Sequence, residues 1–284
     1  MSRAPFLLAN APHGPIRGDV HLPESPLGAP VVVAVHGFKG FKDWGFWPET
    51  ARRLGEAGLA LVTFNLSGSG VGEDGETFTE VERFERNTVT KELDDLGRVL
   101  DAVAGRTIPL GGADIRKLGL LGHSRGGGSV LLRARRDPRV QAVVTWAAVS
   151  TFHRHDAETV REWRERGFLQ VVNARTGQIF KLSTAFLDDL EAHGDAYEPT
   201  EAIRNLEIPV LLIHGTRDES VPPDEANILA RAAGPGVTRL ALIQGAGHTF
   251  GAVHPFRGST PELDIVLEKT IGWFRDGLDR ERRA

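Results

Sequence analysis

The chain contains no cysteine among its 284 residues. A disulfide framework, a cysteine nucleophile and a thiolate metal site are therefore excluded. Long apolar runs are also missing, since no stretch approaches the roughly 20 apolar residues of a membrane span. The apolar patch Phe6 to Leu8 near the N-terminus is too short for a secretory signal. We therefore expect a soluble, cytoplasmic protein that does not bind membranes.

The sequence also has no excess of positive charge. Lysine and arginine total 34 against 38 aspartate and glutamate residues, so the formal net charge is -4. This balance argues against a general electrostatic role on nucleic acid or on an anionic membrane. Hydrophobic residues make up 40% and charged residues 25%, which is typical of a soluble globular protein.

Apolar runs alternate along the chain with amphipathic stretches, the pattern of a mostly parallel sheet with helices on both faces. The class is therefore α/β. An alternating stretch, Ile16 to Leu22, predicts an antiparallel edge strand. The predicted buried strands are Val31 to Val35, Gly58 to Phe64, Leu118 to Leu121, Val140 to Trp146, Ile208 to Ile213 and Leu240 to Ile243. The predicted helices are Trp47 to Ala57, Val89 to Val103, Ser124 to Arg136, Asp224 to Ala233 and Pro261 to Phe274.

One region interrupts this alternation. About sixty residues separate the strand ending at Trp146 from the strand starting at Ile208, far more than a usual connection. The segment Thr151 to Thr200 is rich in charge and in isolated aromatic residues. We interpret residues 151–200 as a small helical cap inserted into a core of residues 1–150 and 201–284, because ligands of open α/β sheets bind at the edge it would cover. The alternative is a pair of surface helices without contact to any site.

The strongest motif is Gly122-His123-Ser124-Arg125-Gly126, which matches G-x-S-x-G between a strand and a helix. A serine on so sharp a turn is exposed above the sheet, and flanking glycines avoid clashes of a Cβ with neighbouring backbone. We predict that Ser124 is a catalytic nucleophile. A glycine-rich turn with an incidental serine is the alternative.

A serine is a weak nucleophile and needs a positioned base. Asp218 and His248 follow two later strands, and serine, acid, histidine is one of the chain orders in which such triads occur. We predict that His248 is the general base and that Asp218 orients its imidazole. Glu219 is the rival acid and His254 the rival histidine.

The loop His36-Gly37-Phe38-Lys39-Gly40 closes the first buried strand. Acyl transfer needs two N–H donors at the tetrahedral oxygen, and we assign them to the backbone of Phe38 and Arg125. His36 is expected to brace the loop.

The following run from Phe41 to Trp47 is aromatic, and two interpretations stay open: a pocket lining, or packing onto the sheet edge. Lys39, Trp44 and His123 are the candidate substrate-binding residues, although a histidine placed like His123 is more often packed or hydrogen-bonded.

Together these motifs resemble the α/β-hydrolase superfamily, from His36 to about Phe274. The segments from His36 to Asp43 and from Asn173 to Gly177 are similar to the dienelactone hydrolase-like and cinnamoyl (feruloyl) esterase-like branch, which borders the prolyl oligopeptidase-type peptidases. The resemblance implies an α/β-hydrolase fold whose helical insertion shapes the substrate pocket.

Two departures from that branch matter. Dienelactone hydrolases use a cysteine nucleophile, whereas this chain has a serine, so the resemblance favours an esterase. Arg125 also replaces the apolar or amide residue often found after the nucleophile. We expect it to pair with an acidic cap residue or with an acidic group of the substrate.

The predicted function is a serine carboxylesterase that cleaves small to medium acyl esters through an acyl-enzyme, without cofactor or metal. A peptidase for small aminoacyl or acyl-peptide substrates is the alternative, and a non-catalytic binding protein on the same scaffold is a third. A metallohydrolase built on His153-Arg154-His155-Asp156 lacks further ligands in the sequence. The partner is expected to be a small-molecule ester, and a monomer and a homodimer both remain open.

Overall fold

A computed structural model describes residues 1–173 and 176–278 of the chain. An eight-stranded sheet runs through it in the order β1-β2-β4-β3-β5-β6-β9-β10. β1 and β2 are antiparallel to their neighbours, and the pairs from β4 to β10 are parallel. The strands are β1 Ser2–Leu8, β2 Ile16–Leu22, β3 Pro30–Val35, β4 Ala60–Asn65, β5 Asp114–His123, β6 Val140–Trp146, β9 Val210–Gly215 and β10 Thr238–Ile243.

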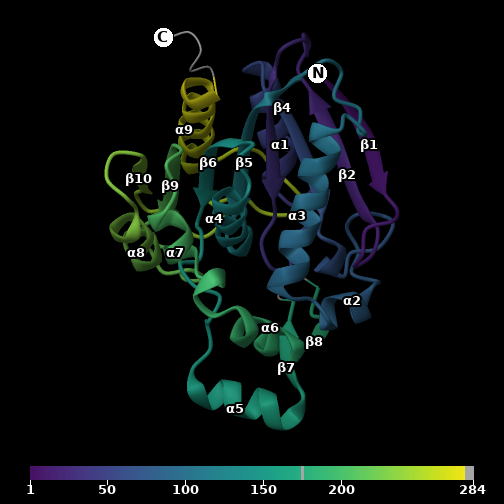
Figure 1. The fold of residues 1–284 in the computed structure, drawn as a ribbon, viewed down its shortest axis with the longest axis vertical. Helices are drawn as coiled ribbons and strands as arrows, with labels where there is room; N and C mark the ends of the chain where they lie inside the picture. Colours follow the sequence, from purple (N-terminus) through teal and green to yellow (C-terminus); the bar gives the residue numbers. More distant parts are fainter. Residues whose placement is uncertain (174–175, 279–284) are drawn as a thin grey trace.

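Helices cover both faces of the sheet (Figure 1). Side chains alternate along a strand, so Val31 and Val33 of β3 enter one core and Val32 and Ala34 the other. One core lies under α1 Trp47–Glu56 and α9 Pro261–Leu278. The other lies under α3 Val89–Ala104, α4 Arg125–Arg136, α7 Pro199–Arg204 and α8 Asp224–Ala232. Burial on both faces explains why the central strands are continuous apolar runs, and the predicted α/β-hydrolase architecture is confirmed.

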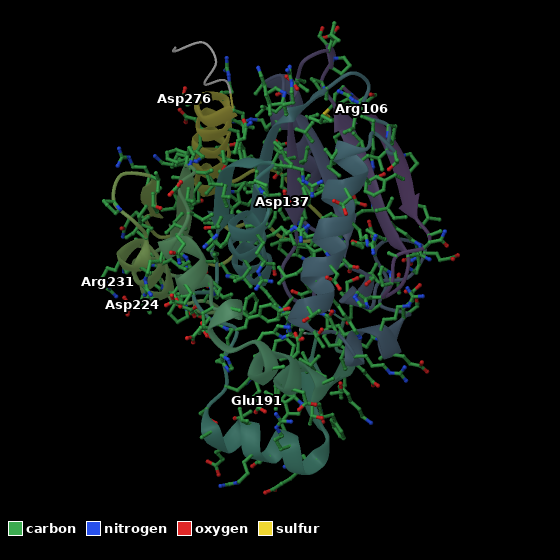
Figure 2. The ribbon with its side chains drawn as sticks, viewed as in Figure 1. Arg106, Asp137, Glu191, Asp224, Arg231 and Asp276 are labelled. Carbon is green, nitrogen blue, oxygen red and sulfur yellow. The ribbon has the colours of Figure 1, made fainter. Side chains whose placement is uncertain are left out.

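The insertion lies at the end of the molecule away from both termini (Figure 1). It comprises α5 Ala157–Arg166, β7 Phe168–Val172, β8 Ile179–Ser183, α6 Ala185–His193 and the short 3₁₀ helix η2 Gly194–Tyr197. The insertion therefore contains a strand pair in addition to the predicted helices, because β7 and β8 pair antiparallel. Figure 2 shows Glu191 of α6 among the polar side chains of this end.

A cluster of aromatic side chains joins the insertion to the core. Phe180 of β8 is fully buried, with its ring 4.7 Å from Phe84 and 5.3 Å from Phe78. Phe84 belongs to the short helix α2 Val81–Glu85, which follows the 3₁₀ turn η1 Ser67–Ser69. Lys39 Nζ adds a polar link by donating to the carbonyl of Val172 at 3.0 Å. The insertion is thus fixed to the loops at one edge of the sheet.

The structure describes only part of one predicted motif. In the segment from Asn173 to Gly177, Ala174 and Arg175 lie outside the described residues.

Across residues 1–173 and 176–278, no helix combines the length and the apolar character needed to cross a bilayer.

Candidate active site

Ser124 lies on the sharp turn between β5 and α4, with φ 57° and ψ -121°. Residues other than glycine rarely adopt such a positive φ, and holding one there costs about 1–3 kcal/mol of conformational free energy. The flanking glycines are required by space. A Cβ on Gly122 would lie 2.3 Å from the carbonyl oxygen of Gly126, and one on Gly126 would lie 2.5 Å from that of His36. The turn therefore has the geometry predicted from the motif, with strain kept at the nucleophile candidate.

Asp218 and His248 meet at the same end of the sheet, after β9 and β10. His248 Nδ1 lies 2.8 Å from Asp218 Oδ2, and the Asp218 side chain is fully buried. Its other oxygen, Oδ1, accepts hydrogen bonds from the backbone N–H groups of Ser220 and Val221, both at 2.9 Å. Burial by itself would raise the pKa of Asp218, but hydrogen bonds from His214 and His248 outweigh it and hold the pKa well below its usual range. Asp218 is thus a carboxylate at neutral pH.

Ser124 and His248 line the same two cavities. Among the described residues, no hydrogen bond joins Ser124 Oγ to the imidazole, as is common in a site without substrate. The two alternative residues, Glu219 and His254, have other surroundings. Glu219 is exposed next to the buried Asp218, and His254 accepts a hydrogen bond from Gly45 N at 3.1 Å while its ring contacts Phe41.

The loop after β3 lies against the nucleophile turn. A Cβ on Gly37 would come within 2.9 Å of Ser124 Cβ, which shows how closely the two backbones approach. Arg125 is the first residue of α4, where backbone N–H groups have no partner within the helix. Phe38 follows Gly37 on the adjacent loop. Both N–H groups thus lie on segments that border Ser124, and they stay the predicted donors of an oxyanion hole.

Two buried histidines support these loops. His36 Nδ1 donates to Gly37 O at 2.9 Å, and its Nε2 accepts from Leu66 N at 3.2 Å, so His36 braces the loop as predicted. Burial lowers the pKa of His36 to about 4.

His123 donates from Nε2 to the backbone carbonyl of His248 at 3.0 Å. Burial, together with the nearby charge of His248, lowers its pKa to about 3. A neutral His123 therefore anchors the loop that carries His248, in addition to lining the smaller cavity.

The larger cavity, about 580 Å³, lies between Ser124 and the insertion. Side chains of the insertion line it, among them Phe152, Leu169 and Phe186. The insertion therefore contacts the candidate site, whereas the division of the chain into core and cap stays a prediction. Volumes of several hundred Å³ suit small organic ligands.

The smaller cavity, about 210 Å³, is bordered by Trp44, Phe46 and Trp47. Both open interpretations of the aromatic run hold in part, since Phe46 and Trp47 are buried and also border the cavity. Lys39 lines both cavities and Trp44 the smaller one.

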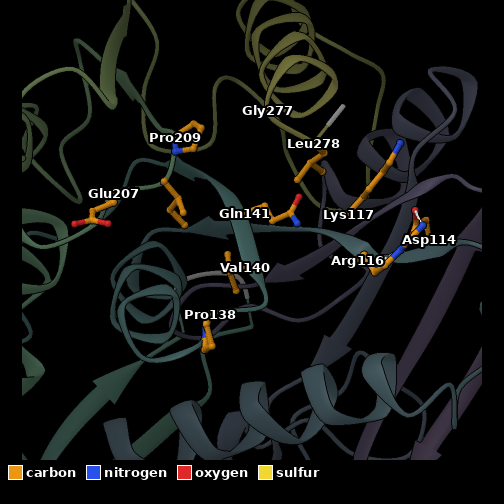
Figure 3. Close-up of a pocket in the computed structure, with 11 residues that line it drawn as sticks. Asp114, Arg116, Lys117, Pro138, Val140, Gln141, Glu207, Pro209, Gly277 and Leu278 are labelled. Carbon is orange, nitrogen blue, oxygen red and sulfur yellow. Dashed lines mark hydrogen bonds and ion pairs between the residues drawn. The ribbon is translucent and has the colours of Figure 1, made fainter. Parts of the chain in front are cut away.

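Another cavity, about 370 Å³, opens at the opposite end of the sheet (Figure 3). Asp114, Arg116, Lys117 and Glu207 line it, at the beginnings of β5 and β9. It contains no serine or histidine side chain among its described residues, so it offers no acyl-transfer chemistry.

The metallohydrolase alternative finds no support in side-chain placement. His153 Nε2 is 3.7 Å from Glu198, whereas the His155 ring packs edge-on against Trp163. Over the described part of the chain, no group of three or more histidine, aspartate or glutamate side chains is arranged to hold a metal ion.

The fold is that of the α/β-hydrolase class. A family profile, the prolyl oligopeptidase family of S9 peptidases, matches residues 49–256. The chain therefore belongs to the prolyl oligopeptidase family. Over 203 residues it is 27% identical to 2,6-dihydropseudooxynicotine hydrolase of Paenarthrobacter nicotinovorans, covering 70% of this chain and 47% of that protein.

Solved structures agree on the fold. Est1E from Butyrivibrio proteoclasticus, with ferulic acid bound, matches with a TM-score of 0.68 and 19% identity, over 96% of this chain and 98% of its own. Dienelactone hydrolase from Anabaena variabilis matches with a TM-score of 0.63 and 18% identity, over 98% and 100%. The predicted resemblance to the α/β-hydrolase superfamily is confirmed, and its structural neighbours include a dienelactone hydrolase.

Sequence reasoning missed several residues of the site. His214, fully buried, places Nε2 3.3 Å from Asp218 Oδ2 and donates to Val221 O. Glu92 of α3 lies 3.1 Å from Arg125, so the expected partner from the cap is replaced by one from the core. His214 was visible as the histidine ending a buried strand, whereas no local pattern marks Glu92, which lies 33 residues before Arg125.

Proposed function

We propose that the protein is a serine carboxylesterase that cleaves small to medium acyl esters through a covalent acyl-enzyme. Ser124 Oγ attacks the ester carbonyl while His248 Nε2 accepts its proton. Asp218, a buried carboxylate 2.8 Å from Nδ1, holds the imidazole in the tautomer whose Nε2 is free to accept, and stabilises the cation that forms.

The backbone N–H groups of Phe38 and Arg125 would stabilise the tetrahedral oxyanion. The imidazolium then protonates the leaving alcohol. In the second half of the reaction, His248 takes a proton from water, which attacks the acyl carbonyl. The imidazolium then returns the proton to Ser124 Oγ as the carboxylic acid leaves. Donors fixed in the fold need little reorganisation at the moment of reaction, which is why such stabilisation is a large part of catalysis.

The observation that carries this proposal is the Asp218–His248 hydrogen bond beside a serine held at positive φ on a cavity wall. The test is the hydrolysis of p-nitrophenyl acetate and butyrate by wild-type protein and by Ser124→Ala. We expect the variant to fold and to lose the activity. Intact activity in Ser124→Ala would overturn the mechanism.

A small-peptide peptidase is the second candidate, and the family to which the chain belongs favours it. The same residues would cleave an amide, with His248 protonating the leaving amine. Aminoacyl p-nitroanilides distinguish the two candidates. Because anilides are intrinsically less reactive than p-nitrophenyl esters, the deciding result is whether the anilides are cleaved at all. We expect no measurable cleavage by an esterase, and a measurable kcat/KM would establish the peptidase.

A further inference from the structure

The charged side chains that line the larger cavity are all basic. Lys39, Arg125 and Arg154 lie in its walls together with the imidazoles of His155 and His248, and its described lining contains no aspartate or glutamate. The chain as a whole carries a net charge of -4. The side chains that line the cavity therefore carry charge opposite in sign to that of the whole molecule. Charge in a partly dry cleft acts more strongly than at the surface.

Two of these cations are already engaged. Arg154 lies 2.5 Å from Glu225 and donates to the carbonyl of Ser220 at 3.1 Å. Lys39 donates to Val172 O, and burial lowers its pKa. Both side chains hold the insertion or a neighbouring loop in place. Neither is the best candidate to receive a new partner.

Arg125 differs from both. It is 9% exposed, and its guanidinium lies between the rings of Phe38 and Phe186, at 5.0 and 4.4 Å from their centroids. Among the described residues the guanidinium donates no hydrogen bond, and Nε and Nη2 are buried without one. Nε and Nη2 are closed to a ligand, so Nη1, the nitrogen of this guanidinium that is not buried, is the one placed in the cavity wall to donate to a carboxylate.

Glu92 only partly compensates this charge. Its Oε1 is 3.1 Å from Arg125 Nη2, an ion-pair contact without hydrogen-bond geometry. The same carboxylate accepts from Asn87 Nδ2 at 2.7 Å and from Ser129 Oγ at 3.3 Å. It is therefore shared among three partners and held away from good alignment with Arg125. A buried cation in this state gains free energy from a second anion.

We propose that Arg125 is a specificity-determining residue that binds a carboxylate of the substrate, so that the site prefers esters bearing an anionic group on the part that fills the larger cavity. The inference rests on the proposed esterase function and names its substrate class. Glu92 sets the strength of the preference, because its charge competes with that of the substrate.

The test compares each carboxylate ester with a neutral analogue. On the acyl side the pair is mono-p-nitrophenyl adipate and p-nitrophenyl hexanoate. On the alcohol side it is the butyrate ester of 4-hydroxybenzoate and phenyl butyrate. The readout is the ratio of kcat/KM for the anionic ester to kcat/KM for the neutral one. Any difference in intrinsic reactivity cancels when the ratio of a variant is divided by that of the wild type.

Variants should move this ratio in opposite directions. Arg125→Gln keeps the backbone N–H but removes the charge, and should lower the ratio about tenfold or more in one pair, the size expected for a lost charge-assisted hydrogen bond. Arg125→Lys should restore part of it. Glu92→Gln should raise the ratio, since it removes the competing charge.

The double variant Arg125→Gln/Glu92→Gln leaves no unpaired buried charge, so it guards against misfolding and should match Arg125→Gln. Arg135→Gln, an exposed residue of the same helix, is the control and should leave the ratio unchanged. A ratio that stays constant in both pairs for Arg125→Gln and Glu92→Gln overturns the proposal and leaves the esterase function standing.

A binding measurement separates the proposal from the proposed function. In a Ser124→Ala background, calorimetry should detect monomethyl adipate more readily than dimethyl adipate, and Arg125→Gln should abolish that difference. If no ester is hydrolysed but this difference is found, the carboxylate site stands and the esterase function falls. Equal binding of the two ligands contradicts the carboxylate site.

Discussion

At the scale of single residues, the site depends on positions that local sequence fixes. Ser124 needs Gly122 and Gly126 because a Cβ at either would overlap backbone within 2.5 Å. Replacement of Gly126 by alanine should therefore displace the turn that carries Ser124. The strain of a serine at φ 57° is held by the strand and helix on either side.

The Asp218–His248 pair makes a prediction of its own. Asp218→Asn should keep the shape of the site but favour the wrong imidazole tautomer, lowering kcat for ester hydrolysis by about 10⁴, as in other triads. His248→Ala should lower the same kcat by roughly a thousandfold or more, because triad members act as a unit. Steady-state kinetics on p-nitrophenyl butyrate measure both. Glu219→Gln, next to Asp218 but exposed, is the control, and a comparable loss there would point to the wrong acid.

At this scale, residues can be predicted from the sequence where the signal is local. The residues around Ser124, Asp218 and His248 lie in short motifs at strand ends, and parallel strands place such ends at one edge. The contacts of Glu92 and Phe186 with Arg125 were not predicted, because both residues belong to elements distant from Arg125 in the sequence. No local pattern encodes such a contact.

At the scale of elements, the central strands were predictable because burial on both faces leaves long apolar runs. β1 was missed because it pairs only with β2 at the sheet edge, and its side chains are exposed or half-buried. β7 and β8 are five residues each within a charge-rich segment. Their alternation is too short to outweigh the expectation of helices.

The β7–β8 pair should depend on the buried ring of Phe180. Phe180→Ala removes contacts to Phe78 and Phe84 and should cost about 3–5 kcal/mol of packing around the hairpin. Hydrogen exchange should then accelerate in β7 and β8 more than in β5 and β6, and ester kcat/KM should fall because the hairpin lines the larger cavity.

The neighbouring side chain provides the matched control for this prediction. Ile179 is 57% exposed, so Ile179→Ala should leave the exchange unchanged. Equal acceleration of exchange in both variants, or none in either, would show that the aromatic cluster does not hold the hairpin.

At the scale of the whole molecule, stability should depend on pH through buried histidines. Burial lowers the pKa of His36 from 6.5 to about 4. Between these values the unfolded chain binds the proton and the folded chain does not, so the free energy of unfolding falls as pH drops from about 6.5 to 4. The contribution of His36 reaches about 3 kcal/mol at most.

Urea unfolding at several pH values in this window tests the claim. The wild-type free energy of unfolding should fall more steeply toward low pH than that of His36→Gln. Asp95, whose pKa burial raises to about 6, acts in the opposite sense, so the comparison of the two proteins isolates His36. Identical pH dependence in both would contradict a neutral, buried His36.

The whole molecule also bears on the substrate that we propose. The insertion and the loop after β3 enclose about 580 Å³ beside Ser124, enough for a small acyl or aryl group. Ser124 lies at one edge of the sheet, the insertion lines the cavity beside it, and Arg125 places a positive charge in the cavity wall. These three features together support the proposal of an esterase for small substrates.

The central claim is that Ser124 is the nucleophile. Treatment with a fluorophosphonate, followed by mass spectrometry of the digested protein, tests it most directly. The account predicts one adduct on Ser124, together with loss of ester hydrolysis, and no adduct in Ser124→Ala. An adduct on a different residue, or unlabelled protein that still hydrolyses esters after treatment, would contradict it.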